Sequence, residues 1–153
     1  MKTILTILLF TSLSTQAQWW KPTQDEGIAT VFMIASGVAK GYQEAVNYNG
    51  YGKGQPFWDI ETSWIRKYKN YPTDTRARFP GSKTVFVIFT DAKHLTTFVN
   101  NTGLIVGTAF NMADFRREWK EYYGWQRVGF IARKMAPYLI RSWVFEKTYK
   151  NLK

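Results

Sequence analysis

The feature that most constrains the fold is a stretch without charged residues, Gly27 to Ala39, that follows a helix-start signal. Thr23 and Glu26 form a capping box, in which each side chain can accept the other residue's backbone N–H. The pattern predicts a helix from about Gln24 to Asn47. The uncharged stretch is shorter than the about 20 residues that cross a bilayer, so we expect this helix to pack against protein.

Small residues recur one turn apart within this predicted helix. They form two overlapping pairs: Ala35 with Ala39, and Gly37 with Gly41. Small side chains at this spacing let a second backbone approach closely. We therefore expect this helix to pack tightly against a second helix. Asn, Gly and Pro residues predict a turn-rich loop after it, over residues 47–56.

The stretch FPGSKTVFVIFTDAKHL, residues 79–95, allows three interpretations. It is not a Walker A phosphate loop, because Lys83 does not follow a glycine. Val85 to Phe89 are good strand formers, but apolar residues recur at steps of three and four, which favours a helix. These residues are Val85, Ile88, Ala92, Leu95 and Val99. We predict a helix capped by Ser82, with a break near residues 101–103 and a short buried element after it.

The remaining segments also favour helices. Trp64 and Tyr68 have the spacing of a helical pair, and Asp114 is placed to cap another helix. A last amphipathic helix, bent at Pro137, has an apolar face of Val128, Ala132, Met135, Leu139 and Trp143. Its opposite face carries Arg127, Arg133, Lys134, Arg141, Lys147 and Lys150. We predict a mainly α fold, a single-domain helical bundle with irregular loops.

The N-terminus has the three-part layout of a secretory signal peptide. One Lys precedes an apolar run, and small or polar residues ending at Ala17 follow it. We predict a signal peptide over residues 1–17, a single helical domain over residues 18–153, and a periplasmic or envelope-associated location. The chain contains no Cys, so its stability must come from packing, to which 18% aromatic residues contribute.

The chain is basic, with a formal net charge of +10. Residues 114–153 hold ten Lys or Arg against four Asp or Glu. Basic proteins bind nucleic acid, anionic lipid or acidic polymers, and export makes nucleic acid an unlikely partner. We expect Arg133, Lys134 and Arg141 to bind an anionic membrane surface or an acidic envelope polymer. The oligomeric state stays open.

Asp91 and His94, the only histidine, lie three residues apart and are the candidate catalytic pair. A carboxylate can orient an imidazole, and both groups can bind zinc. Glu44 is a candidate third member, with Asp59 and Glu61 as other carboxylates that could complete a site. A hydrogen-bonded pair without catalysis is the competing interpretation. We predict no metal site and no cofactor, because a metal site needs three or more protein ligands and their spacing is not evident.

Three sequence blocks resemble a family of uncharacterised small proteins of bacterial and phage genomes. The blocks are SW-x-x-KYKN, F-x-GS-x-T and TD-x-x-HL, at residues 63–70, 79–84 and 90–95. The resemblance implies a mainly helical, often membrane-associated protein and brings no established activity. The chain departs from the family's pattern at Lys40, where an acid is expected, and at Ala92 and Lys93, where Gly-Trp is usual. The lost acid argues against catalysis.

Together these features predict an exported, basic, envelope-associated protein that binds or has a structural role. The alternative is a small metal-dependent or acid/base hydrolase that uses Asp91 and His94. Convergence of these two residues with a second carboxylate in one pocket would separate the two hypotheses.

Overall fold

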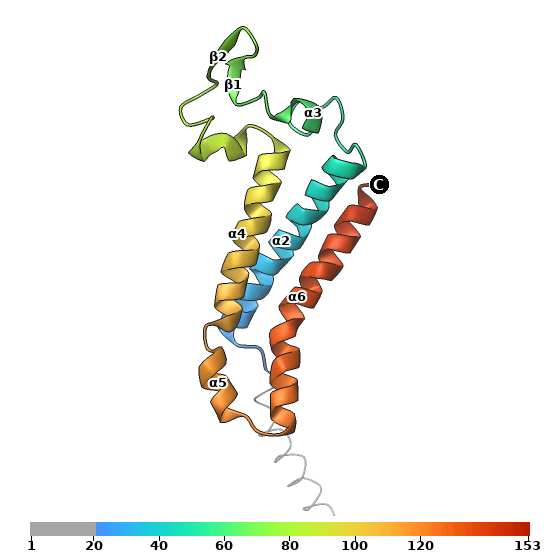
Figure 1. The fold of residues 1–153 in the computed structure, drawn as a ribbon. Helices are drawn as coiled ribbons and strands as arrows, with labels where there is room; N and C mark the ends of the chain where they lie inside the picture. Colours follow the sequence, from blue (N-terminus) through green and yellow to red (C-terminus); the bar gives the residue numbers. More distant parts are fainter. Residues whose placement is uncertain (1–20) are drawn as a thin grey trace, which may run out of the picture.

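The fold is mainly α, as the sequence predicts. The computed structural model describes residues 21–153, so the predicted signal peptide lies outside the described residues. Three long helices run side by side: α2 (Gln24–Tyr48), α4 (Ala92–Met112) and α6 (Trp125–Asn151) (Figure 1). Helix α2 packs along both α4 and α6, whereas α4 and α6 touch each other little.

Shorter elements occupy the two ends of the bundle (Figure 1). At one end, residues 49–91 form what we call the cap lobe. It contains α3 (Ile60–Ser63), the antiparallel strands β1 (Tyr68–Asn70) and β2 (Asp74–Ala77), and the 3-10 helix η2 (Val85–Phe89). At the other end, α5 (Phe115–Glu121) connects α4 to α6. The C-terminus lies at the cap-lobe end (Figure 1).

Helix α2 begins at the predicted capping box. The backbone N–H of Thr23 donates to Glu26 Oε2 at 2.9 Å, and the backbone N–H of Glu26 donates to Thr23 Oγ1 at 3.2 Å. Farther along the helix, Ala29 and Met33 are fully buried. This confirms the predicted helix and its packing against protein.

The small residues of α2 lie where another helix comes closest. A Cβ atom on Gly37 would lie 2.6 Å from the backbone oxygen of Arg141, and one on Gly41 would lie 2.6 Å from Thr148 Cβ. This confirms the predicted tight helix pair and identifies α6 as its second member. On the other side of α2, Gly103 of α4 makes an equally close approach, because its Cβ would lie 2.7 Å from Phe32 O.

The predicted helix start at Ser82 is wrong. Ser82 is buried, and its hydroxyl donates to the backbone oxygen of Lys67 at 2.8 Å. Residues 85–89 form one short 3-10 helix instead, and α4 begins after Asp91, whose carboxylate caps it. The predicted break near residues 101–103 is also wrong, because α4 is continuous there and Gly103 packs on α2.

The predicted helical pair of Trp64 and Tyr68 is wrong as well. Helix α3 ends at Ser63, and Tyr68 begins strand β1. The Trp64 ring packs edge-on against Tyr71, with ring centroids 4.9 Å apart. The spacing of Trp64 and Tyr68 gave a wrong prediction because Tyr68 lies in a strand and the ring of Trp64 packs on Tyr71, which follows that strand.

On helix α6, the residues of the predicted apolar face point to solvent, and part of the predicted basic face points into the bundle. Val128, Met135 and Leu139 of the apolar face are exposed, whereas Arg133 and Lys134 of the basic face are buried. Pro137 lies inside this helix, as predicted. No helix within residues 21–153 has both the length and the apolar character needed to cross a membrane.

Candidate functional site

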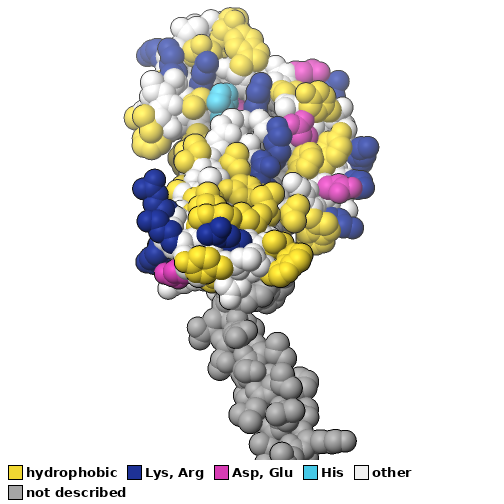
Figure 2. Space-filling view, turned by 60° about the horizontal axis from the view of Figure 1, so that its bottom comes forward, with side chains coloured by type: hydrophobic (Ala, Val, Ile, Leu, Met, Phe, Trp, Pro, Cys, Tyr) yellow, Lys and Arg dark blue, Asp and Glu magenta, His cyan; other side chains and the backbone are white. Residues whose placement is uncertain are grey.

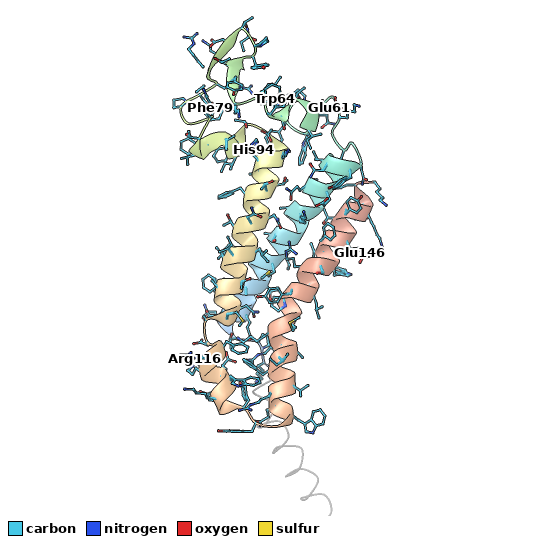
Figure 3. All side chains as sticks on the ribbon, viewed as in Figure 1. Glu61, Trp64, Phe79, His94, Arg116 and Glu146 are labelled. Carbon is cyan, nitrogen blue, oxygen red and sulfur yellow. The ribbon has the colours of Figure 1, made fainter. Side chains whose placement is uncertain are left out.

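Asp91 and His94 are in direct contact at the start of α4 (Figure 3). The side chain of Asp91 is fully buried, and its Oδ1 accepts the backbone N–H of His94 at 3.0 Å. Its Oδ2 lies 2.7 Å from His94 Nδ1 and 2.9 Å from Thr90 Oγ1. The pair arises because an N-cap carboxylate reaches the third residue of the helix, so the i, i+3 spacing places both groups together.

With an ionised Asp91, the contact with His94 determines the imidazole tautomer. An ionised carboxylate only accepts hydrogen bonds, so the proton between Asp91 Oδ2 and His94 Nδ1 belongs to the imidazole. Nε2 of a neutral His94 is then left as an acceptor, and the side chain is 36% exposed. Chemically, the pair can take up or release a proton at Nε2, which is the role of an oriented general base.

The other predicted carboxylates do not join this pair. Glu44 forms an ion pair with Lys40 on α2. Asp59 caps α3 by accepting the backbone N–H of Glu61 at 3.0 Å, and Glu61 lies 3.5 Å from Lys53 Nζ. Throughout residues 21–153, no group of three or more His, Cys, Asp or Glu is arranged to hold a metal ion. The structure therefore offers a two-residue pair at this position.

Arg133 and Lys134, predicted to bind an anionic surface, are instead buried in a charge cluster. Arg133 Nε lies 3.0 Å from Glu26 Oε1, and Lys134 Nζ lies 2.8 Å from the same oxygen. Glu118 of α5 contacts both cations, with its Oε1 3.4 Å from Lys134 Nζ. These four side chains, two acids and two bases, are each less than a tenth exposed.

This burial corrects the prediction that Arg133 and Lys134 contact an anionic surface. Two charges can leave water only when partners of opposite sign compensate them, and Glu26 and Glu118 supply that compensation. Glu26 also completes the α2 capping box, so one carboxylate caps a helix and neutralises buried cations. Cap motifs are visible in the sequence, but ion pairs between distant segments leave no local signal.

Arg141, the third predicted surface contact, joins the three long helices. Its Nε donates to Ser36 Oγ on α2 at 2.9 Å, and its Nη2 donates to Asn100 Oδ1 on α4 at 3.0 Å. Ser36 Oγ in turn lies 3.0 Å from Asn100 Oδ1. Arg141 therefore has a structural role in the bundle and does not belong to an exposed ligand-binding surface.

The exposed face of α6 is apolar over much of its length. We call its exposed apolar residues the α6 stripe: Val128, Ile131, Met135, Leu139 and Trp143. Steps of three or four residues place them on one side of the helix. Trp125, 86% exposed, precedes the stripe. Figure 2 shows apolar side chains side by side on the surface toward the α5 end, with Lys and Arg side chains beside them.

In the cap lobe, Asp74 has a lowered pKa. The Arg76 guanidinium donates to both carboxylate oxygens of Asp74, at 2.9 and 2.8 Å. This side-chain hydrogen bonding, followed by the backbone N–H of Arg76, lowers the pKa of Asp74 from 3.8 to about 2. The pair lies within strand β2, because Asp74 and Arg76 are two residues apart on it.

Comparison with protein-family models, with curated proteins and with solved structures finds no match for this chain. The resemblance of the three sequence blocks to the bacterial and phage family therefore stays a prediction.

Proposed function

We propose that this chain is an exported protein that binds at the cell envelope, where the α6 stripe lies on the membrane surface. The observation that carries the proposal is the orientation of α6: the apolar side chains of the stripe face outward while Arg133 and Lys134 are turned inward. A helix normally buries its apolar side. The inverted arrangement supports an apolar partner outside the bundle.

The size of the stripe supports the same proposal. Val128 and Trp143 are separated by about 22 Å along the helix, at about 1.5 Å per residue. Large contiguous apolar patches are rare on soluble monomers and mark protein or membrane interaction sites. Patch size alone does not choose between these two partners.

Lipid is favoured because of what flanks the stripe. Trp125 and Trp143 lie at its two ends, and tryptophan prefers the depth of lipid headgroups. Exposed basic residues continue beyond both ends: Arg116, Arg117 and Lys120 on α5, and Lys147 and Lys150 on α6. Figure 3 shows Arg116 at the opposite end of the molecule from His94. Basic residues near an anionic leaflet each contribute about 1 kcal/mol.

This proposal keeps the expected anionic membrane partner but changes the residues that contact it. An acidic envelope polymer would attract the basic ends of the molecule, but it has no hydrocarbon to cover Leu139 or Met135. Export through the residue 1–17 signal stays a prediction, which the mass of the processed chain would test.

Flotation with vesicles tests the membrane proposal. The protein should float with vesicles of phosphatidylglycerol and phosphatidylcholine, and Met135→Glu with Leu139→Glu should abolish flotation. Val85→Glu is the matched control, because Val85 is 76% exposed but lies in the cap lobe. Equal flotation of the α6 variant and the unmodified protein would exclude the proposal. If the unmodified protein self-associates without floating and the α6 variant does not self-associate, the stripe would instead be a contact surface for a second copy of the chain.

An acid/base hydrolase is the second candidate, and one observation favours it: buried Asp91 contacts His94 Nδ1, while the His94 side chain is 36% exposed. With His94 as the base, water would be the attacking group. Hydrolysis of p-nitrophenyl esters that His94→Gln abolishes would support this activity. Equal rates for the variant and the unmodified protein would exclude it.

A further inference from the structure

A second feature, separate from the α6 stripe, is a cavity of about 430 Å³ in the cap lobe. Two arginines and three phenylalanines dominate its lining, which consists of Pro56, Phe57, Arg66, Arg78, Phe79, Phe89 and Thr90. Ligand cavities typically combine apolar walls with a few polar groups in this way. The two arginines are twelve residues apart in the sequence, and the fold brings them to the same cavity.

The arginines of the cavity have unused hydrogen-bonding capacity. A guanidinium has five N–H donors. Arg66 uses one, from Nη2 to Thr62 Oγ1 at 3.3 Å, while its buried Nε makes no hydrogen bond within the described chain. Among residues 21–153, no carboxylate lies within ion-pair distance of Arg66 or Arg78. A ligand with several acceptor oxygens would fill this deficit.

The segment that contains both arginines is rich in positive charge. Residues 64–90 contain six Lys or Arg and one acid, Asp74. Asp74 is held by Arg76, and the nearby Asp91 is held by His94 and Thr90. The local acids are therefore occupied, and the positive field at the cavity remains for an anion from outside.

The aromatic walls and the fixed backbone indicate the rest of the ligand. Phe57, Phe79 and Phe89 would cover an apolar group attached to the anion. The lobe is tied in place, because the Phe57 carbonyl accepts the Ala92 N–H at 2.8 Å. The carbonyl of Lys67 likewise accepts the Arg78 N–H at 3.0 Å. A wall fixed in this way lowers the ordering cost of binding.

We infer that the cavity binds a phosphate monoester carried on an apolar body, with its oxygens on Arg66 and Arg78 and its hydrocarbon against the phenylalanines. Guanidinium groups match phosphate oxygens geometrically, and the dianion balances two arginines. The same chemistry is found in a soluble alkyl phosphate and in the headgroup of phosphatidic acid. The inference does not require the α6 stripe to bind membrane.

Titration of the full-length protein with hexyl phosphate, followed by NMR, tests the inference. The Arg66 Nε–H resonance should shift on binding. Arg66→Gln and Arg66→Lys should weaken affinity by about tenfold to a hundredfold, because each loses charge-assisted hydrogen bonds. Lys69→Gln is the control: it removes one charge from the lobe, and Lys69 does not line the cavity.

Four further results would support or overturn a phosphate monoester site in this cavity. Weaker binding of inorganic phosphate and of hexanol than of hexyl phosphate would support a site that needs both parts of the ligand. Competition by phosphatidic acid vesicles would support a lipid source, and its absence a soluble one. Unchanged affinity in Arg66→Gln would overturn the inference. An equal loss in Lys69→Gln would also overturn it, since the binding would then be diffuse electrostatic attraction.

Discussion

The buried cluster of Glu26, Glu118, Arg133 and Lys134 yields the most demanding prediction for stability. Glu118→Gln removes one negative charge and leaves two cations facing a single carboxylate in the interior. Removing one partner of a buried ion pair costs about 3–5 kcal/mol, because the remaining charge is uncompensated. A chain of this size should then melt about 10–20 °C lower.

A compensated variant separates charge imbalance from lost packing. Lys134→Met restores equal numbers of acids and bases when combined with Glu118→Gln. The double variant should lose about 1–3 kcal/mol less free energy of unfolding than the sum of the losses in the two single variants. Urea unfolding followed by circular dichroism at 222 nm measures all three free energies of unfolding.

The exposed ion pair of Glu146 and Lys150 on α6 provides the control. Both groups are solvated, so Glu146→Gln should leave the unfolding midpoint almost unchanged. A Glu118→Gln variant as stable as Glu146→Gln, together with an additive double variant, would refute the reasoning. The cluster would then be open to water and contribute no more than a surface pair.

Three further predictions concern individual contacts. The lowered pKa of Asp74 means that the stabilisation from its pair with Arg76 is fully present above pH 3.8 and is lost as the pH falls through about 2. NMR titration of its carboxyl carbon should show this midpoint, and Arg76→Gln should return it toward 3.8. Gly37→Ala should destabilise the fold by about 1–3 kcal/mol through overpacking against Arg141, whereas an unchanged urea midpoint would show that the helices can separate. Asp91→Ala should lower the free energy of unfolding by about 0.5–2 kcal/mol through loss of the α4 cap. Hydrogen exchange at the first turn of α4 should increase, and unchanged exchange would show that the cap does not stabilise the helix.

Several features of the protein followed from the sequence by itself because they depend on neighbours in the chain. The capping box of Thr23 and Glu26 specified the start of α2 through hydrogen bonds within four residues. The spacing of Gly37 and Gly41 specified a close helix contact, since only a missing Cβ allows it. The contact of Asp91 with His94 was likewise local, although its role as the α4 cap was assigned to Ser82.

Tertiary structure decided the features that depend on distant partners. The periodicity of α6 defines two faces but does not state which one points inward. Arg133 and Lys134 turned inward because Glu26 and Glu118, on other helices, compensate their charges. Burying these cations required carboxylates brought together by the fold, and the exposed apolar stripe is the consequence on the opposite face of the same helix.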